Sequence, residues 1–283
     1  MRNVLFVFAL LVLVLAPPAH ANNPFDEVTQ LDLWKVIEAG DIQGAERMFA
    51  DAYAQGLRDP ENRHHVRWLY EVFGTSSPEA TSFAVKWAED FPDSPFSHTA
   101  LAWVYYRTGY DIRGEEFARE TYIDALGAFY QWHQKAWWHA EKAYGLEPNL
   151  LPASDAILRL AKSAHRRLRA IIVLDEVMAQ NPNMGTLLRG LDMTTQDWGS
   201  FQFLGEVICK IYGPLIKKED GTNTTKLCLL HAAGFYHRTA KREWLLAEAQ
   251  KREFPEIDYF YAGAIPTKIA TREQAAFLYE YLS

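Results

Sequence analysis

Small and hydrophobic residues recur at helical spacing along most of this chain, and prolines interrupt the pattern at regular intervals. An interval of twelve residues from an alanine to a proline occurs three times, at Ala80–Pro92, Ala136–Pro148 and Ala170–Pro182. The last two of these prolines are 34 residues apart. A unit of that length with helical periodicity is typical of stacked helical hairpins. Strand patterns are nearly absent, so we predict an all-α fold.

The first hairpin is predicted over residues 27–57. Its first helix carries an apolar stripe at helical spacing, made of Leu31, Trp34 and Ile37. Gly40-Asp41 interrupts the pattern, and a second helix follows. One face of that helix holds Ala45, Phe49 and Ala52. The two small residues allow close approach of a neighbouring helix, and Phe49 fills the space between hairpins.

A second hairpin pairs residues 64–73 with residues 78–90, and Ser77-Pro78 provides an N-cap and a first-turn proline. An aromatic helix is then expected over Phe96–Thr108, closed by Gly109. Here the period breaks, because Pro92 and Pro148 are 56 residues apart, 22 more than one unit. We place the insertion at about 110–131 and expect a charged loop that leads into a long helix. Insertions in repeat arrays often project from the binding face.

The next units are more regular. We expect helices over residues 152–166, 167–180 and 186–194. After Ser200 the alanine-to-proline spacing disappears, although residues 201–212, 223–237 and 240–252 remain amphipathic. A last helix, beginning at Thr271, caps the array. The predicted organisation is therefore a repeat region over 22–200 and a C-terminal helical region over 201–283.

The N-terminus has the three parts of a secretory signal. Arg2 supplies a positive charge, Val4–Leu15 is an unbroken apolar run, and the following segment ends in Ala19-His20-Ala21. The apolar run is shorter than the roughly 20 residues that a membrane-spanning helix needs. We therefore predict cleavage after Ala21, a periplasmic or secreted mature protein, and no stable membrane insertion after cleavage.

Composition narrows the function classes. The chain is 49% hydrophobic and 14% aromatic, so it can bury a large core. Its formal net charge is −7, which makes nucleic acid an unfavourable partner. The two cysteines, Cys209 and Cys228, lie on neighbouring predicted helices. Because exported proteins meet oxidising conditions, we expect a disulfide between them, with two buried thiols as the alternative.

Several segments resemble known helical repeats. Gly40, Ala45, Phe49 and Ala52 look like second-helix positions of a tetratricopeptide repeat, although the usual Trp-Leu-Gly of the first helix is missing. A wider match over about residues 31–206 resembles a bacterial family known only as domain of unknown function 4034. From the N-terminus, the shared features are Ala100–Trp103, Arg107-x-Gly109, a charged insertion, Lys142–Pro148 and Trp198-Gly199-Ser200. The resemblance implies a tetratricopeptide-like α-solenoid with an insertion in the middle and a C-terminal helical cap. It implies no activity.

In such solenoids the first helix of each hairpin lines a concave groove. If each proline ends a unit, positions counted from Pro92, Pro148 and Pro182 face that groove. The count gives aromatic and basic candidates: Trp103, Tyr106, Arg107, Arg159, Lys162 and Arg189. Guanidinium groups bind carboxylates through two hydrogen bonds, and aromatic side chains anchor peptides. These residues predict a groove for an acidic peptide or a C-terminal carboxylate. The alternative is that they lie on ordinary solvated helix faces.

Metal and catalytic signals are weak. His133 and His139, like His231 and His237, are six residues apart, whereas metal pairs on helices are four apart. We predict no metal, no cofactor and no catalytic residue, since no hydrolase, zinc or phosphate-loop motif occurs. Three tryptophans in the centre of the chain could stack on sugar rings, namely Trp132, Trp137 and Trp138, but tryptophan on a helix more often packs in the core.

The favoured hypothesis is an exported, non-enzymatic scaffold or adaptor of the cell envelope that binds a protein or peptide. Two alternatives stay open. One is an envelope enzyme or glycan-binding factor, and the other is an immunity or accessory protein of a secretion system.

Overall fold

The computed structural model describes residues 29–58, 65–114, 120–194, 204–216 and 223–234, and every regular element in these ranges is a helix. The all-α prediction is confirmed for these residues, while the solenoid and the repeat family stay predictions. The predicted signal sequence, the turn at Trp198-Gly199-Ser200 and the helices beginning at Ala240 and Thr271 lie outside them. No helix in the described ranges combines the length and apolarity needed to cross a membrane.

Two helices form the first hairpin, α1 (Gln30–Ala39) and α2 (Ile42–Arg58). Thr29 and Asp32 cap the start of α1 reciprocally, and Gly40 ends it in the left-handed conformation with φ 64°. The predicted α1 stripe is partly wrong, because Leu31 is 65% exposed and Leu33 is fully buried instead. Leu33 and Ile37 are one turn apart, so they share the face that packs on the core. The predicted α2 face is buried at all three positions.

The second hairpin consists of α3 (His65–Tyr70), the 3₁₀ helix η3 (Glu71–Gly74) and α4 (Pro78–Asp90). Ser77 caps α4 by accepting a hydrogen bond from the Ala80 N–H. Phe49 from the first hairpin inserts between Tyr70 and Trp87, at ring-centroid distances of 4.6 and 5.2 Å. These aromatic contacts join the two hairpins into one core.

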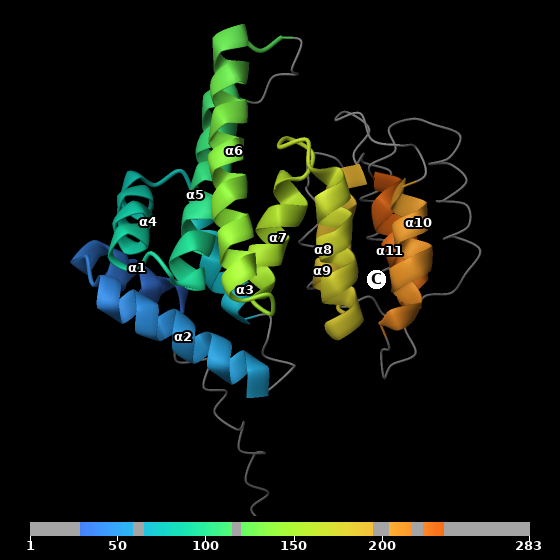
Figure 1. Cartoon of the computed structure of the whole chain (residues 1–283), viewed down its shortest axis with the longest axis horizontal. Helices are drawn as coiled ribbons and strands as arrows, with labels where there is room; N and C mark the ends of the chain where they lie inside the picture. Colours follow the sequence, from blue (N-terminus) through green and yellow to red (C-terminus); the bar gives the residue numbers. More distant parts are fainter. Residues whose placement is uncertain (1–28, 59–64, 115–119, 195–203, 217–222, 235–283) are drawn as a thin grey trace, which may run out of the picture.

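The inserted residues lengthen a pair of helices, α5 (Pro95–Arg113) and α6 (Ile123–Leu146). The expectation that Gly109 ends a helix is wrong, because α5 continues one further turn to Arg113. Gly109 instead lies against α6, where a Cβ atom at this position would overlap the His133 ring. Figure 1 shows the two helices packed along each other and projecting beyond the rest of the molecule.

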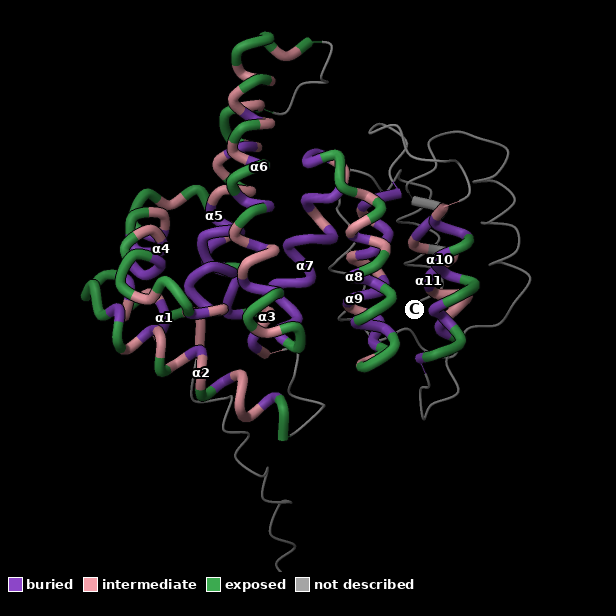
Figure 2. Tube along the Cα trace, viewed as in Figure 1, coloured by how far each residue is buried: buried purple, intermediate pink, exposed green. Residues whose placement is uncertain are grey.

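The centre of the molecule is α7 (Leu151–Leu160), whose residues from Leu151 to Leu158 are all buried (Figure 2). It contacts α3, α5 and α6 on one side, and α8 (Arg167–Gln180) and α9 (Met184–Leu191) on the other. A short 3₁₀ helix, η4 (Asp192–Thr194), follows α9. A helix buried all round holds polar side chains only where they find partners, and α7 carries one carboxylate, Asp155.

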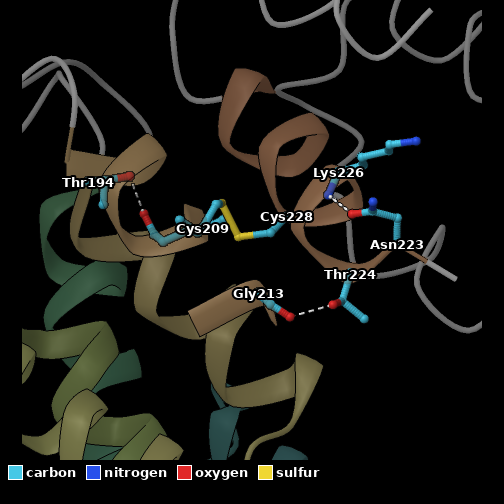
Figure 3. The surroundings of a disulfide bond; sticks show 8 residues. Thr194, Cys209, Gly213, Asn223, Thr224, Lys226 and Cys228 are labelled. Carbon is cyan, nitrogen blue, oxygen red and sulfur yellow. Dashed lines mark hydrogen bonds between the residues drawn. A yellow bond between two sulfur atoms is a disulfide. The ribbon is translucent and has the colours of Figure 1, made fainter. Parts of the chain in front are cut away.

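The last described elements are α10 (Leu204–Tyr212), the 3₁₀ helix η6 (Gly213–Leu215) and α11 (Thr224–Gly234). Both α-helices pack on α9. Cys209 of α10 and Cys228 of α11 form a disulfide, and Thr224 donates a hydrogen bond to the Gly213 carbonyl (Figure 3). The bond agrees with the pairing expected from the sequence and ties the two helices together at their buried sides.

Candidate functional site

A cavity of about 240 Å³ lies where α3, α5, α7 and α9 meet. These are the first helices of successive hairpins, so the site is built from segments far apart in the sequence. Its walls are formed by Arg67, Glu71, Gly74, Trp103, Pro152, Asp155, Arg159 and Arg189. Three guanidinium groups and two carboxylates therefore share one small space, in a protein whose net charge is negative.

Arg67 of α3 neutralises the buried carboxylate of α7. Its Nη2 donates a hydrogen bond to one oxygen of Asp155 at 2.9 Å, and its Nε lies 2.7 Å from the other oxygen as an ion-pair contact. The Asp155 side chain is 4% exposed and that of Arg67 is 13% exposed, so the pair is largely shielded from water. This pair links α3 to α7 and leaves neither charge available for a ligand.

The same guanidinium reaches the start of α9. Its Nη1 donates to Asn183 Oδ1 at 3.0 Å, and its Nη2 donates to the Thr186 hydroxyl at 2.5 Å. Asn183 is the N-cap of α9 and accepts from the Thr186 N–H with that same oxygen. Gly185 allows this approach, because a Cβ atom there would overlap Arg67 Nη1. Arg67 thereby fixes one wall of the cavity.

Arg159 is held by aromatic rings more than by a carboxylate. Its guanidinium carbon lies 4.9 Å from the centre of the Trp103 ring and 6.0 Å from that of Tyr106. The nearest contact to a carboxylate is 3.9 Å, from Nε to Asp192, and this Nε has no hydrogen-bond acceptor among the described residues. Burial lowers the pKa of Arg159, but Tyr106 and the two nearby aspartates raise it above its usual range overall. Arg159 is thus a cation held in place by its neighbours, with an N–H group that could donate a hydrogen bond to a ligand.

Arg189 of α9 completes the basic wall. It makes no hydrogen bond or ion pair to any residue in the described part of the chain. Burial and the neighbouring charge of Arg159 lower its pKa, while Asp155 and Asp192 oppose this. Burying a charge without a partner costs free energy. An anion that contacted Arg189 would lower this cost.

The structure brings three of the six groove residues expected from the sequence to this cavity: Trp103, Arg159 and Arg189. Tyr106 lies behind them, 6.1 Å from the Trp103 ring. Arg107 and Lys162 are not among the lining residues. The Arg107 side chain is 46% exposed, pairs with Asp111 at 2.9 Å and donates to Ser76.

The count from Pro148 also reaches Pro152 and Asp155, whereas three lining residues were missed by the sequence analysis: Arg67, Glu71 and Gly74. They occupy the same places after Pro60 that Thr99, Trp103 and Tyr106 occupy after Pro92. Counting from Pro60 as well would have identified all three. The signal was overlooked because Pro60 follows the first hairpin without the alanine twelve residues earlier that marked the other units.

The central histidines are packed between α5 and α6. His133 is fully buried, accepts from the Ser163 hydroxyl at 2.5 Å and donates to the Tyr106 carbonyl at 3.0 Å. Both side chains are fully buried. His139 shares a hydrogen bond of 2.8 Å with His98, whose other nitrogen donates to the Pro92 carbonyl. Burial lowers the pKa of both His133 and His139 to about 4.

Two of the three central tryptophans carry a lysine over the ring, and Trp138 is 57% exposed. Trp137 is buried, and the ammonium groups of Lys135 and Lys142 lie over Trp132 and Trp138 at 4.4 and 5.7 Å. Glycan stacking on these rings stays a prediction. No group of three or more His, Cys, Asp or Glu side chains within the described ranges is arranged to hold a metal ion.

Comparison with known proteins identifies no relative. No protein-family profile, no curated protein and no solved structure matches the chain. The suggested membership of the family of unknown function therefore stays a prediction, and function has to be argued from the cavity itself.

Proposed function

We propose that this chain is an exported, non-enzymatic binding protein that holds an acidic segment of a partner protein or peptide at the cavity between α3, α5, α7 and α9. The observation that carries the proposal is Arg189. It lines the cavity next to Arg159 and has no hydrogen-bond or ion-pair partner within the described residues. A ligand carboxylate would supply the missing acceptor for both guanidinium groups.

Two further observations support this proposal. Trp103 and Tyr106 hold the Arg159 guanidinium in place before any ligand arrives, which reduces the ordering that binding would require. The Cys209–Cys228 disulfide agrees with an oxidising compartment, as expected for an exported protein. A partner in the cell envelope would meet the chain in such a compartment.

The test compares capture of proteins from an envelope extract by three forms of the chain. The native protein and a control carrying Lys35→Glu and Lys135→Glu should retain the same partner. The variant with Arg159→Glu and Arg189→Glu should lose it. Both variants change the net charge equally, and the control residues are exposed and do not line the cavity. Equal capture by all three forms, or retention of glycan fragments alone, would contradict the proposal.

A further inference from the structure

The cavity proposed to hold an acidic segment is also lined by a carboxylate on one side. Glu71 of η3 lines it and is exposed. Like Arg189, it makes no hydrogen bond or ion pair to any residue in the described ranges. Two groups of opposite charge therefore line one cavity, and no ion pair joins them.

Two of the other charges around the cavity are already paired. Arg67 and Asp155 neutralise each other through an ion pair. Arg159 stacks on Trp103 and has a loose contact with Asp192. What remains for a ligand is a pair of guanidinium groups on α7 and α9, and a single carboxylate on η3.

A ligand that carried only carboxylates would satisfy half of this arrangement. The guanidinium groups would attract it, but Glu71 would repel any second carboxylate that entered the same small space. A ligand with a carboxylate and a nearby cation would satisfy both walls at once. Electrostatic complementarity of this kind selects among partners more than it adds affinity.

We infer that the segment held in this cavity places a cationic side chain beside its carboxylate, and that Glu71 receives the cation. The inference rests on the proposed function, because it assigns chemistry to the same cavity. It makes Glu71 a specificity-determining residue: acidic runs are rejected and mixed acid–base segments are preferred. The basic residues alone suggest a purely acidic ligand. Glu71 restricts this to ligands that also carry a cation.

The gap at Gly74 is consistent with this role. Gly74 ends η3 and lies next to the Trp103 ring, and a Cβ atom there would be 3.8 Å from the ring. Gly74 therefore adds no side chain to this part of the cavity wall. A lysine or arginine side chain of the ligand has a long flexible stem, which can carry its charged end to Glu71.

The test uses three acetylated and amidated tetrapeptides as probes: Gly-Asp-Lys-Gly, Gly-Asp-Gln-Gly and Gly-Asp-Glu-Gly. Their dissociation constants are measured by calorimetry with the native chain, with Glu71→Gln and with Arg189→Gln. Exposed ion pairs are worth a few-fold in affinity, so the native chain should prefer the lysine probe over the glutamine probe by about threefold to fivefold. The glutamate probe should bind most weakly.

In Glu71→Gln the preference for lysine should disappear and the glutamate probe should bind more tightly than it does to the native chain. Arg189→Gln should weaken all three probes. A native chain that binds the glutamate probe as well as the lysine probe, or a lysine preference that persists in Glu71→Gln, would overturn the inference while leaving the proposed function intact. If no probe binds the native chain at millimolar concentrations, or if Arg189→Gln changes nothing, the proposed function falls and the inference falls with it.

Discussion

At the scale of single residues, Arg67 and Asp155 form a largely buried ion pair between α3 and α7. Replacing Asp155 by asparagine leaves a guanidinium that is 13% exposed without its counter-charge. Breaking a buried pair on one side typically costs about 3 kcal/mol or more. We therefore expect Asp155→Asn to lower the free energy of unfolding by about that amount in urea titration.

The control for this prediction is the exposed pair of Lys35 and Asp32, in which the lysine side chain is 65% exposed. Lys35→Gln should leave the urea midpoint unchanged within error, because surface pairs contribute little. Equal effects of the two substitutions would show that burial of the Arg67 pair does not matter for stability.

His133 makes stability depend on pH. Its pKa is lowered to about 4 by burial, compared with 6.5 for the free side chain. Between these values the unfolded chain binds the proton and the folded chain does not, so stability is full above about pH 6.5 and is lost progressively as the pH falls toward 4. The shift corresponds to up to about 3 kcal/mol.

Urea titrations at about pH 7 and about pH 5 measure this effect. His139 has a similarly lowered pKa and adds to the loss in the same direction. His133→Asn should be less stable than the native chain at neutral pH but should lose less stability on acidification. An unchanged pH dependence in this variant would show that His133 is not the responsible group.

At the scale of elements, the close contact of α5 with α6 depends on Gly109. Alanine normally stabilises a helix by up to about 1 kcal/mol relative to glycine. Here the added Cβ atom would overlap the His133 ring, which two hydrogen bonds hold in place. Gly109→Ala should therefore destabilise the protein, by about 1–3 kcal/mol in thermal or urea unfolding.

Gly127 provides the matched control on α6, because nothing lies within 4 Å of a Cβ atom at that position. Gly127→Ala should stabilise the protein by about 0.5–1 kcal/mol. If both substitutions raised stability, the tight approach of the two helices at Gly109 would be ruled out.

The disulfide governs the last pair of described helices. Cys209 and Cys228 are 19 residues apart, and closing a loop of that length stabilises a fold by about 3 kcal/mol. Replacing both cysteines by serine should lower the unfolding free energy by about that amount, and probe binding at the cavity should be preserved because neither cysteine lines it. Identical unfolding curves for oxidised and reduced native protein would contradict this assignment.

The helical pattern predicted elements better than it predicted their faces and ends. The face of α2 was identified correctly because two alanines and a phenylalanine recur every three or four residues, which places them on one side of a helix. The α1 face was misjudged because Leu31 and Leu33 are both apolar, and only packing decides between them. Gly109 was taken as a helix end since glycine usually breaks helices, whereas here it serves close packing of two helices. That role depends on a partner 24 residues away, which local patterns do not contain.

At the scale of the whole molecule, part of the cavity could be predicted from the proline spacing. Counting from three prolines led to Trp103, Arg159 and Arg189, which line one space. Two features could not be predicted: the pairing of Arg67 with Asp155, and the lack of a hydrogen bond or ion pair from Arg189 to any described residue. Both depend on which side chains reach each other across α3, α7 and α9. The negative wall at Glu71 could have been predicted by the same count if it had also started from Pro60.

The measurement that tests the central claim most directly is a double-mutant cycle between Arg189 and the ligand carboxylate. The probe Gly-Asp-Lys-Gly and its asparagine counterpart, Gly-Asn-Lys-Gly, are titrated against the native chain and against Arg189→Gln. If Arg189 receives the carboxylate, the native chain should bind the aspartate probe about tenfold more tightly, and the two probes should bind Arg189→Gln almost equally. The same aspartate-to-asparagine ratio in both proteins would contradict the account.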